Sequence, residues 1–343
     1  MPLAVTDLSA DALGGLFVTG TTEGGEVGTQ RYTAGGVLNT SFGFAGTRLL
    51  PRFTSEGTST PSGQRLEFAK VEVPPTFVDS GTWWLGVKRL LASAQPDRSY
   101  GHDGYAVFPD AKEATSLGMI VQPDGGAIVA FQAATALPPG RQSRERPPPA
   151  SRSLLVRLTP AGKLDRSFGT HGITKLPFQN PGPTLITMHG GHVWIAAGGR
   201  AGSTQSLALA EFTRDGHPDT TFAKAGMAAV IFPTGERYTG VSPRAITFDS
   251  AGDAIVVGEQ SIRTVDTPAG DAFLARFTPH GRDCSFGADG LLVDERFVAA
   301  NDVTVQPDGR IVVAGGAGRF VAARYLGTGA PRTCPGEPRA PRH

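Results

Sequence analysis

Several features that would point to a familiar class of protein are scarce or absent in this sequence. It has two cysteines among 343 residues, Cys284 and Cys334, too few for a disulfide framework or a cysteine-based metal cluster. It has no run of 18 apolar residues, so we expect no membrane-spanning helix. The formal net charge is +1, which provides no electrostatic attraction for nucleic acid or an anionic membrane. Only six of the 32 basic residues are lysines, a bias that reflects a GC-rich genome rather than a phosphate-binding surface.

The N-terminus also lacks the pattern of a secretory signal peptide. The first residues, MPLAVTDLSADALGG, contain no basic region and carry two early aspartates, Asp7 and Asp11. A signal peptide begins with positive charge, followed by an apolar segment. Taken literally, this start predicts a cytoplasmic protein.

Glycine and proline are abundant instead. The chain contains 46 Gly and 27 Pro, a composition typical of many short strands joined by tight turns. Hydrophobic residues make up 39% of the chain, which is enough for a packed core and argues against disorder. We therefore expect an all-β fold.

A Ser-Phe-Gly unit, which we call the turn motif, recurs along the chain. Its copies are NTSFGFAG (39–46), DRSYGHDG (97–104), DRSFGTHG (165–172), DTTFAKAG (219–226) and DCSFGADG (283–290), and a short apolar stretch follows each of them. Their aromatic residues are Phe42, Tyr100, Phe168, Phe222 and Phe286. Their first residues are Asn39, Asp97, Asp165, Asp219 and Asp283.

Two further elements precede each turn motif. The first is a hairpin pattern, clearest in VTVQPDGRIVVAGG (303–316), where Asp-Gly between β-branched runs favours a tight turn with positive φ. In the second repeat we place this hairpin in TFVDSGTWWLGV (76–87). The second element is a short strand such as LVRLTPAG or LARFTPHG, which we call the arginine strand. Its recurring residues are Arg31, Arg89, Arg157, Arg276 and Arg324, with Glu211 as the exception.

Four short strands in about 55 residues, repeated six times, predict a β-propeller. We expect about six blades of four antiparallel strands in a single domain at 1–330, followed by a flexible tail at 331–343. The repeats lie at roughly 1–50, 51–108, 109–177, 178–232, 233–295 and 296–330. A β-solenoid is the alternative, but its coils usually repeat at roughly 20–30 residues.

The strand count leaves one blade incomplete. The strand after the turn motif occurs five times and the other three occur six times, while the tail APRTCPGEPRAPRH has no apolar run to supply the missing strand. Either one blade has three strands, or the true start of the protein lies upstream of Met1. An upstream segment could hold a signal peptide, so the localisation stays open.

The pattern L-D-x-S-F-G-x-x-G followed by V-Q-P-D-G-R-I-V-V-A-G resembles the delta-60 repeat family, an uncharacterised bacterial β-propeller-like repeat. The resemblance extends over nearly the whole chain and is most specific in the last two repeats. It implies a propeller fold and often a secreted or cell-surface setting. It supplies no catalytic or binding residues.

Residues that recur in every repeat are expected to hold the blade. The four aspartates of the turn motif can accept local backbone N–H bonds, and the arginine of the preceding strand can pair with them. The repeated aromatic residues would fill the gap between blades. A calcium or ligand role for the aspartates is the alternative, and we otherwise expect no cofactor.

Other candidate sites are weaker. His189 and His192, in HGGH, suggest a metal pair, but the simpler interpretation is a glycine-rich turn with two exposed imidazoles, because no further ligands can be identified. Cys284 and Cys334 hold the same slot in RDCSFG and RTCPGE, and either a disulfide or two free thiols fits this placement. No Ser/His/Asp spacing or nucleophile elbow is present.

The irregular segments, at about 51–66, 132–152, 233–243 and 259–271, are all expected on one face of the propeller, opposite the uniform turns. The longest, Ala133–Ser153, is rich in proline. It carries Arg141, Arg144, Arg146 and Arg152. It is either a solvated loop or a contact for an anionic or acidic partner.

These features favour a non-catalytic propeller scaffold, a monomer that binds a protein or glycan partner through variable loops on one face. The alternative is a metal-dependent propeller hydrolase or lactonase with its site in the central channel, which rests on analogy of fold. We expect no nucleic-acid partner.

Overall fold

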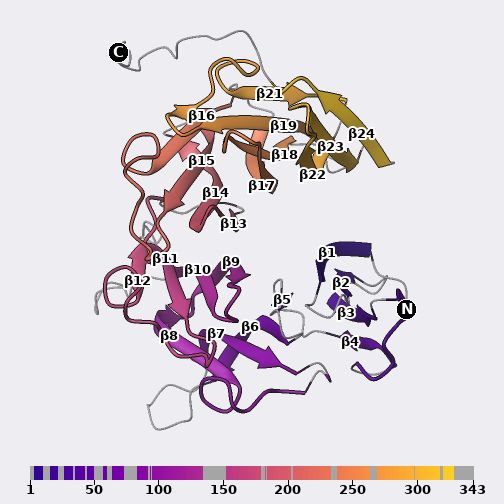
Figure 1. Ribbon diagram of the computed structural model, residues 1–343, viewed down its shortest axis with the longest axis vertical. Coiled ribbons are helices and arrows are strands. Elements are labelled where there is room, and N and C mark those ends of the chain that lie inside the picture. Colours follow the sequence, from indigo (N-terminus) through magenta and orange to yellow (C-terminus); the bar gives the residue numbers. More distant parts are fainter. Residues whose placement is uncertain are drawn as a thin grey trace, which may run out of the picture. The chain divides into compact units, whose positions relative to one another are not determined.

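The computed structural model describes residues 4–10, 16–21, 27–33, 35–42, 45–49, 57–59, 64–72, 83–91, 93, 95–133, 152–178, 182, 184–201, 204–232, 238–262, 269–296, 298–316 and 320–327. The regular elements formed by these residues are all β-strands (Figure 1). No helix in this part of the chain is long and apolar enough to cross a membrane.

The strands form six antiparallel sheets, which we name A to F in chain order. Sheet A contains β1 (Ala4–Ala10), β2 (Leu16–Thr21), β3 (Val27–Tyr32) and β4 (Thr47–Leu49). Sheet B contains β5 (Gly57–Ser59), β6 (Arg65–Glu72), β7 (Trp83–Leu90) and β8 (Tyr105–Lys112). Sheet C contains β9 (Thr115–Val121), β10 (Ala127–Ala133), β11 (Arg152–Leu158) and β12 (Ile173–Lys175).

The remaining three sheets follow the same plan. Sheet D contains β13 (Thr184–His189), β14 (His192–Ala201), β15 (Thr204–Phe212) and β16 (Met227–Ile231). Sheet E contains β17 (Tyr238–Phe248), β18 (Ala254–Ile262), β19 (Ala269–Thr278), the two-residue β20 (Gly281–Arg282) and β21 (Leu291–Asp294). Sheet F contains β22 (Ala299–Val305), β23 (Ile311–Gly316) and β24 (Phe320–Tyr325).

This architecture confirms the predicted fold class: the described residues are all-β and form the sheets of a β-propeller, five with at least four strands and one with three. In each complete sheet the strand after the turn motif pairs back onto the arginine strand, as β12 does on β11 and β21 does on β19. A blade therefore runs from its hairpin through the arginine strand to the turn motif and a last strand. Among the described residues, sheet F lacks that last strand.

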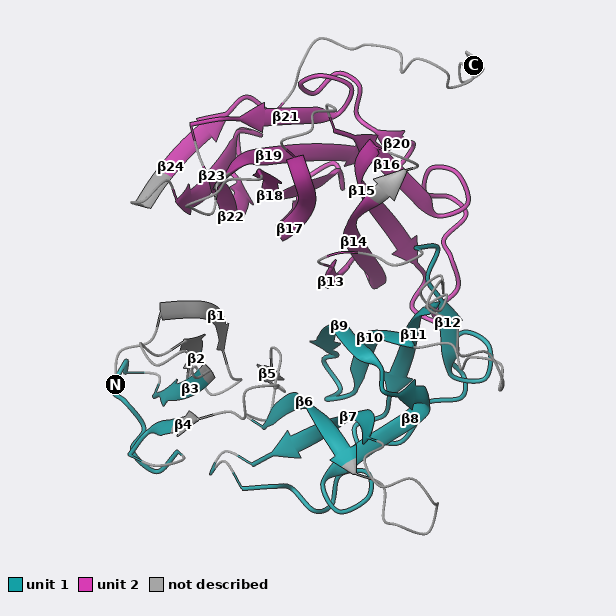
Figure 2. Ribbon diagram, turned by 180° about the vertical axis from the view of Figure 1, so that it is seen from behind, with its two compact units in different colours: residues 1–179 teal, residues 180–343 magenta. Residues whose placement is uncertain are grey.

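The chain divides into two compact units, residues 1–179 and 180–343 (Figure 2). Sheets A to C belong to the first unit and sheets D to F to the second. In the first unit, one apolar core lies between sheets B and C and includes Phe68, Val87, Phe131 and Val156. In the second unit, separate cores join sheet D to sheet E and sheet E to sheet F. Each of these cores is thus shared by two successive blades.

A polar contact also ties the three-stranded sheet to its neighbour. The Tyr325 hydroxyl, at the end of β24, donates to Asp294 Oδ2 at the end of β21, over 2.6 Å. Arg296 donates to both oxygens of Asp294, at 2.8 and 2.6 Å. The hydrogen bonds from Arg296 come first among the causes that lower the pKa of Asp294 to about 2. Sheet F is therefore joined to sheet E by a charged contact as well as by packing.

The predicted position of the second hairpin was wrong. The strand that pairs with β7 is β6, in continuous register from Arg65↔Leu90 to Glu72↔Trp83, whereas we had placed the hairpin at 76–87. Residues 76–82 lie outside the described residues. The error arose because β6 is rich in charge: Arg65 and Glu67 are each 1% exposed, and Glu67 pairs with both Arg65 (3.1 Å) and Lys88 (3.2 Å). A strand whose ions are buried as a group does not show simple polar-out alternation.

The structure describes one of the two cysteines. Cys284 is 4% exposed and is disulfide-bonded. The other cysteine of the sequence, Cys334, lies outside the described residues.

The aromatic residue of the turn motif should be a major source of stability. Phe168 is fully buried, and its replacement by alanine is expected to cost about 3–5 kcal/mol, because both the apolar transfer energy and a cavity are lost. Val107→Ala, at a residue 42% exposed in the same unit, should change stability by less than about 0.5 kcal/mol. Urea unfolding measures both, and equal effects of the two substitutions would contradict the packing described here.

Candidate functional site

The turn motif is built around one carboxylate with two different tasks. In sheet C, Asp165 Oδ1 accepts hydrogen bonds from the Ser167 backbone N–H (3.0 Å) and hydroxyl (2.7 Å). Asp165 Oδ2 accepts from Arg157 Nε (2.8 Å). The first pair of bonds fixes the turn, and the third ties the turn to the arginine strand. The next glycine, Gly169, has a φ of +55°, a conformation that favours glycine.

The same arrangement recurs in the other copies. Asp97 accepts from Ser99 at 3.1 and 2.6 Å and from Arg89 at 2.9 Å, and Asp283 accepts from Ser285 at 2.9 and 2.6 Å. In sheet A, Asn39 takes the place of the aspartate and accepts from Ser41 at 3.1 and 2.6 Å. Serine N–H and hydroxyl groups of the protein thus bind the carboxylates of these aspartates, which the sequence had identified as recurring residues.

In sheets B and C the aromatic residue of the turn motif lies beneath the arginine. Arg89 and Arg157 stack over the rings of Tyr100 (4.6 Å) and Phe168 (5.1 Å), as in a cation–π contact. All five aromatic residues are buried: Phe42 1%, Tyr100 0%, Phe168 0%, Phe222 2% and Phe286 3% exposed.

Turn motifs also contact the next blade. In the first unit, the Gly101 N–H of sheet B donates to the Ala161 carbonyl of sheet C (2.8 Å). In the second unit, the Ala223 N–H of sheet D donates to the Pro279 carbonyl of sheet E (2.9 Å). The turn motif therefore orders its own blade and positions the following one.

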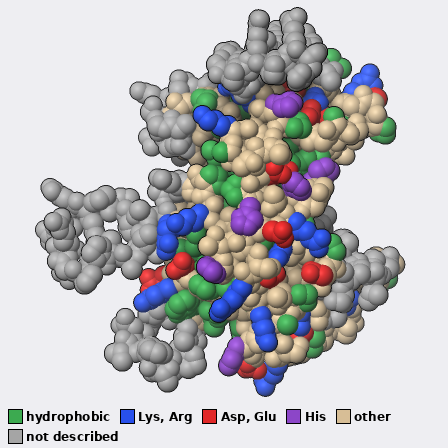
Figure 3. All heavy atoms as spheres, turned by 60° about the vertical axis from the view of Figure 1, so that its left-hand side comes forward, with side chains coloured by type: hydrophobic (Ala, Val, Ile, Leu, Met, Phe, Trp, Pro, Cys, Tyr) green, Lys and Arg blue, Asp and Glu red, His purple; other side chains and the backbone are tan. Residues whose placement is uncertain are grey.

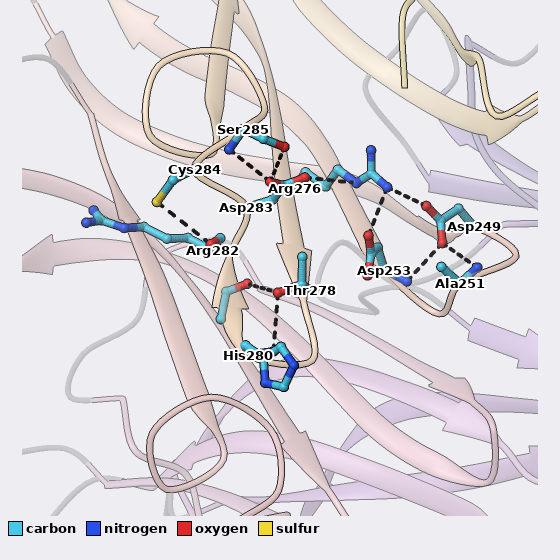
Figure 4. A network of polar contacts seen from close by, with 11 residues as sticks. Asp249, Ala251, Asp253, Arg276, Thr278, His280, Arg282, Asp283, Cys284 and Ser285 are labelled. Carbon is cyan, nitrogen blue, oxygen red and sulfur yellow. Dashed lines mark hydrogen bonds and ion pairs between the residues drawn. The ribbon is translucent and has the colours of Figure 1, made fainter. Parts of the chain in front are cut away.

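Sheet E shows the most highly charged version of this arrangement (Figure 4). Arg276 Nη2 lies 2.7 Å from Asp249 and 2.8 Å from Asp253, and its Nε lies 3.4 Å from Asp283. Asp249 and Asp253 come from the β17–β18 hairpin, so the arginine is shared between hairpin and turn motif. Burial raises the pKa of Asp253, although the hydrogen bond and charge of Arg276 act in the opposite direction.

Sheet D transposes these charges. Glu211 stands where sheet E has Arg276, since each precedes the last buried phenylalanine of its strand. His192 stands where sheet E has Asp253. Each directly precedes the hairpin-strand residue that pairs with this phenylalanine. Asp219 and Asp283 occupy equivalent places in their turn motifs. The order Asp–Arg–Asp in sheet E thus becomes His–Glu–Asp in sheet D.

The three side chains of sheet D converge. His192 Nδ1 lies 2.7 Å from Glu211 Oε1 and 3.0 Å from Asp219 Oδ2. The Nδ1 atom is buried, yet neither contact has the geometry of a hydrogen bond. Within the part of the chain that the structure describes, this is the one group of three or more His, Cys, Asp or Glu side chains placed to hold a metal ion.

The protein fixes one of the two carboxylates firmly. Asp219 Oδ1 accepts from the Thr221 backbone N–H (2.9 Å) and hydroxyl (2.6 Å), which leaves Oδ2 toward His192. The hydrogen bond from the Thr221 side chain is the first of the causes that lower the pKa of Asp219. Burial raises the pKa of Glu211, and the nearby charge of Asp219 acts in the same direction while His192 opposes it.

The two histidines of HGGH therefore have different environments. His189 stacks on Phe248, with ring centroids 3.9 Å apart, and is not a member of the three-residue cluster. His192 faces Glu211 and Asp219, the carboxylate partners that the sequence alone did not identify. The signal was present in the sequence as the single glutamate in the arginine slot.

The arginine-rich segment can be followed only at its end. Arg141, Arg144 and Arg146 lie outside the described residues. Arg152, the first residue of β11, is 3.5 Å from Asp110, with both side chains 45% exposed.

Among the comparisons with known proteins, only the family model bears on the fold. A family model for a β-propeller domain of unknown function, DUF5122, matches residues 306–331. No curated protein sequence matches the chain. Solved structures with a similar chain path include a levansucrase variant from B. megaterium, at 10% identity and a TM-score of 0.39 over 86% of this chain and 87% of that one. They also include hydrazine synthase from Kuenenia stuttgartiensis, at 10% identity and a TM-score of 0.44 over 95% and 97%. At these values the similarities carry no inference about activity.

The donors of the turn motif should be visible in acid unfolding. The hydrogen bonds from Ser99 lower the pKa of Asp97, so the stability that this contact provides is present above about pH 4 and is lost as the pH falls further. Ser99→Ala should therefore reduce stability by about 1 kcal/mol at pH 7 and by less at pH 2–3. Unfolding free energies measured at both pH values, with exposed Ser250→Ala as control, test this. A pH-independent loss would contradict it.

Proposed function

We propose that this protein is a non-catalytic β-propeller scaffold that binds a protein or glycan partner through the variable ends of its blades. We also propose that it belongs to the delta-60 repeat family, on the turn-motif and hairpin residues it shares with that repeat. The observation that supports the binding function is the difference between the two ends of each sheet. We call the end with the hairpin and the turn motif the regular end, and the opposite end the variable end.

The regular ends of sheets B to E are built on the same turn. The Asp–Ser or Asp–Thr turn recurs in four sheets with nearly the same distances, and an arginine or a histidine joins it to the rest of the blade. Such repetition is expected of a scaffold, because each of these blades needs a turn that reverses the chain between its last two antiparallel strands. In sheets B, C and E the turn-motif aspartate already faces an arginine of the same blade, which leaves little freedom for a partner at these positions.

The variable ends differ from sheet to sheet. In sheet C, β10 and β11 are joined by the arginine-rich segment. In sheet E, β17, β18 and β19 reach 11, 9 and 10 residues, so strands extend into segments that we had expected to be loops. Register shifts between Tyr238 and Gly240 and between Pro243 and Ala245 interrupt β17, and such bulges redirect side chains. Variation on a rigid framework is where binding specificity usually resides.

The charge distribution suits a partner that is recognised locally. On the face drawn in Figure 3, basic and acidic side chains of the described residues are interspersed. Together with the net charge of +1, this mixture favours short-range contacts over long-range attraction.

The binding proposal is tested by charge reversal at the two ends of one sheet. Arg152 lies at the variable end of sheet C, and the exposed Arg166 lies at its regular end in the turn motif. Arrays of neutral and acidic oligosaccharides, and a set of acidic peptides, are probed with the wild type, Arg152→Glu and Arg166→Glu. We expect a ligand whose binding is lost in Arg152→Glu and kept in Arg166→Glu. Equal loss in both variants, or turnover of the ligand, would argue against this function.

Shortening the arginine-rich segment should leave the scaffold folded. Ala133 and Arg152 are a cross-strand pair, so a two-residue Asn-Gly turn can replace residues 134–151. Stability should stay unchanged or rise by up to about 2 kcal/mol, because the shorter loop costs less entropy to close. Circular dichroism and urea unfolding check this, and failure to fold would show that 134–151 contributes to the blade itself.

A further inference from the structure

We propose that His192, Glu211 and Asp219 form a binding site for a divalent transition-metal ion of the Zn²⁺ type. The site lies at the regular end of sheet D and is independent of the partner-binding proposal. It joins the β13–β14 hairpin, the end of β15 and the turn motif that follows, which are the three elements that Arg276 joins in sheet E.

The first argument is one of charge. In sheets B, C and E, the turn-motif aspartate faces an arginine that is always protonated. In sheet D the same position holds a second carboxylate, so Glu211 and Asp219 are both directed at one point. Their side chains are only 12% and 10% exposed, which limits the help that solvent gives to two like charges. A divalent cation would neutralise the pair and replace the missing guanidinium.

The second argument is the placement of His192. Its Nδ1 lies close to both carboxylates and is buried, but it does not donate a hydrogen bond to either of them. When Nδ1 is deprotonated, its lone pair is directed toward the two carboxylates, where a cation can accept it. In tetrahedral zinc sites, metal–ligand distances near 2.0–2.2 Å place neighbouring ligand atoms about 3.4 Å apart. The contacts of 2.7 and 3.0 Å need to open by about 0.7 and 0.4 Å, respectively, to admit the ion.

The third argument is support from the surrounding residues. Thr221 holds Asp219 through Oδ1 by two hydrogen bonds, so Oδ2 has a fixed direction, as expected of a carboxylate that ligates a metal. The His192 side chain is 36% exposed, so water can reach the cluster and complete the coordination. One nitrogen and two oxygen ligands favour a transition-metal ion over Ca²⁺ or Mg²⁺, which take oxygen ligands.

The test is Zn²⁺ binding by metal-free protein, measured by calorimetry and by competition with a chromogenic chelator at neutral pH. We expect one equivalent for the wild type. Glu211→Gln should weaken binding by more than about 100-fold, and Thr221→Val by roughly 10-fold, as for loss of a ligand and of an outer partner, respectively. Co²⁺ in place of Zn²⁺ should give a visible spectrum that Glu211→Gln abolishes.

Two controls separate the site from simpler explanations. The double variant His192→Asp, Glu211→Arg restores the charge order of sheet E and should fold with wild-type stability while binding no Zn²⁺. His189→Asn should bind as the wild type does. If instead His189 is required and Glu211 is not, the ion is held by the exposed hairpin histidines and the proposal is wrong. If the wild type takes up no Zn²⁺, His192 serves as an imidazolium between the two carboxylates, and the proposal is equally overturned.

Discussion

Sheets B and C depend on one interaction, the aspartate that accepts from its own turn with one oxygen and from the preceding strand with the other, and the same turn recurs in sheets D and E. The first set of bonds makes a tight reversal in a few residues, and the second prevents the reversal from swinging away from the sheet. Because the turn also meets the next blade, as Gly101 meets Ala161 and Ala223 meets Pro279, a local hydrogen-bond pattern determines how successive sheets pack. The aromatic residue beneath the arginine fills the space that this geometry encloses.

Much of the fold could be predicted because its determinants are local. Asp-x-Ser-Phe-Gly specifies a turn within a few residues, and an Asp-Gly hairpin does the same, so counting them was enough to predict the six sheets, including the one with three strands among the described residues. Sheet B was the exception. The strand at Arg65–Glu72 buries a charged group, Arg65, Glu67 and Lys88, whose mutual pairing is a property of two strands together. No pattern within one strand reports it.

The candidate site was only half predictable for a related reason. The sequence singles out His192 as a possible metal ligand and Glu211 as the exception among the strand arginines, but it does not connect the two residues. What brings them together is strand register: Trp194 pairs with Glu211 across the sheet, which places His192 and the turn-motif Asp219 on either side of that glutamate. Register depends on pairing between strands, and one residue of error would have sent Glu211 to the other face. Comparison of sheets D and E shows which residues occupy equivalent positions, and this reveals the cluster.

The transposed charges of sheets D and E have a consequence for how such a chain can grow by duplication. Exchanging only β15 and β19 would leave Asp249, Asp253 and Asp283 facing a glutamate with no cation among them, a buried cluster of like charge. An exchange that carried the hairpin, the arginine strand and the turn motif together would keep each set of charges balanced. The smallest segment that can be copied or recombined without penalty is therefore the stretch from hairpin to turn, and its limits are determined by electrostatics as much as by strand pairing.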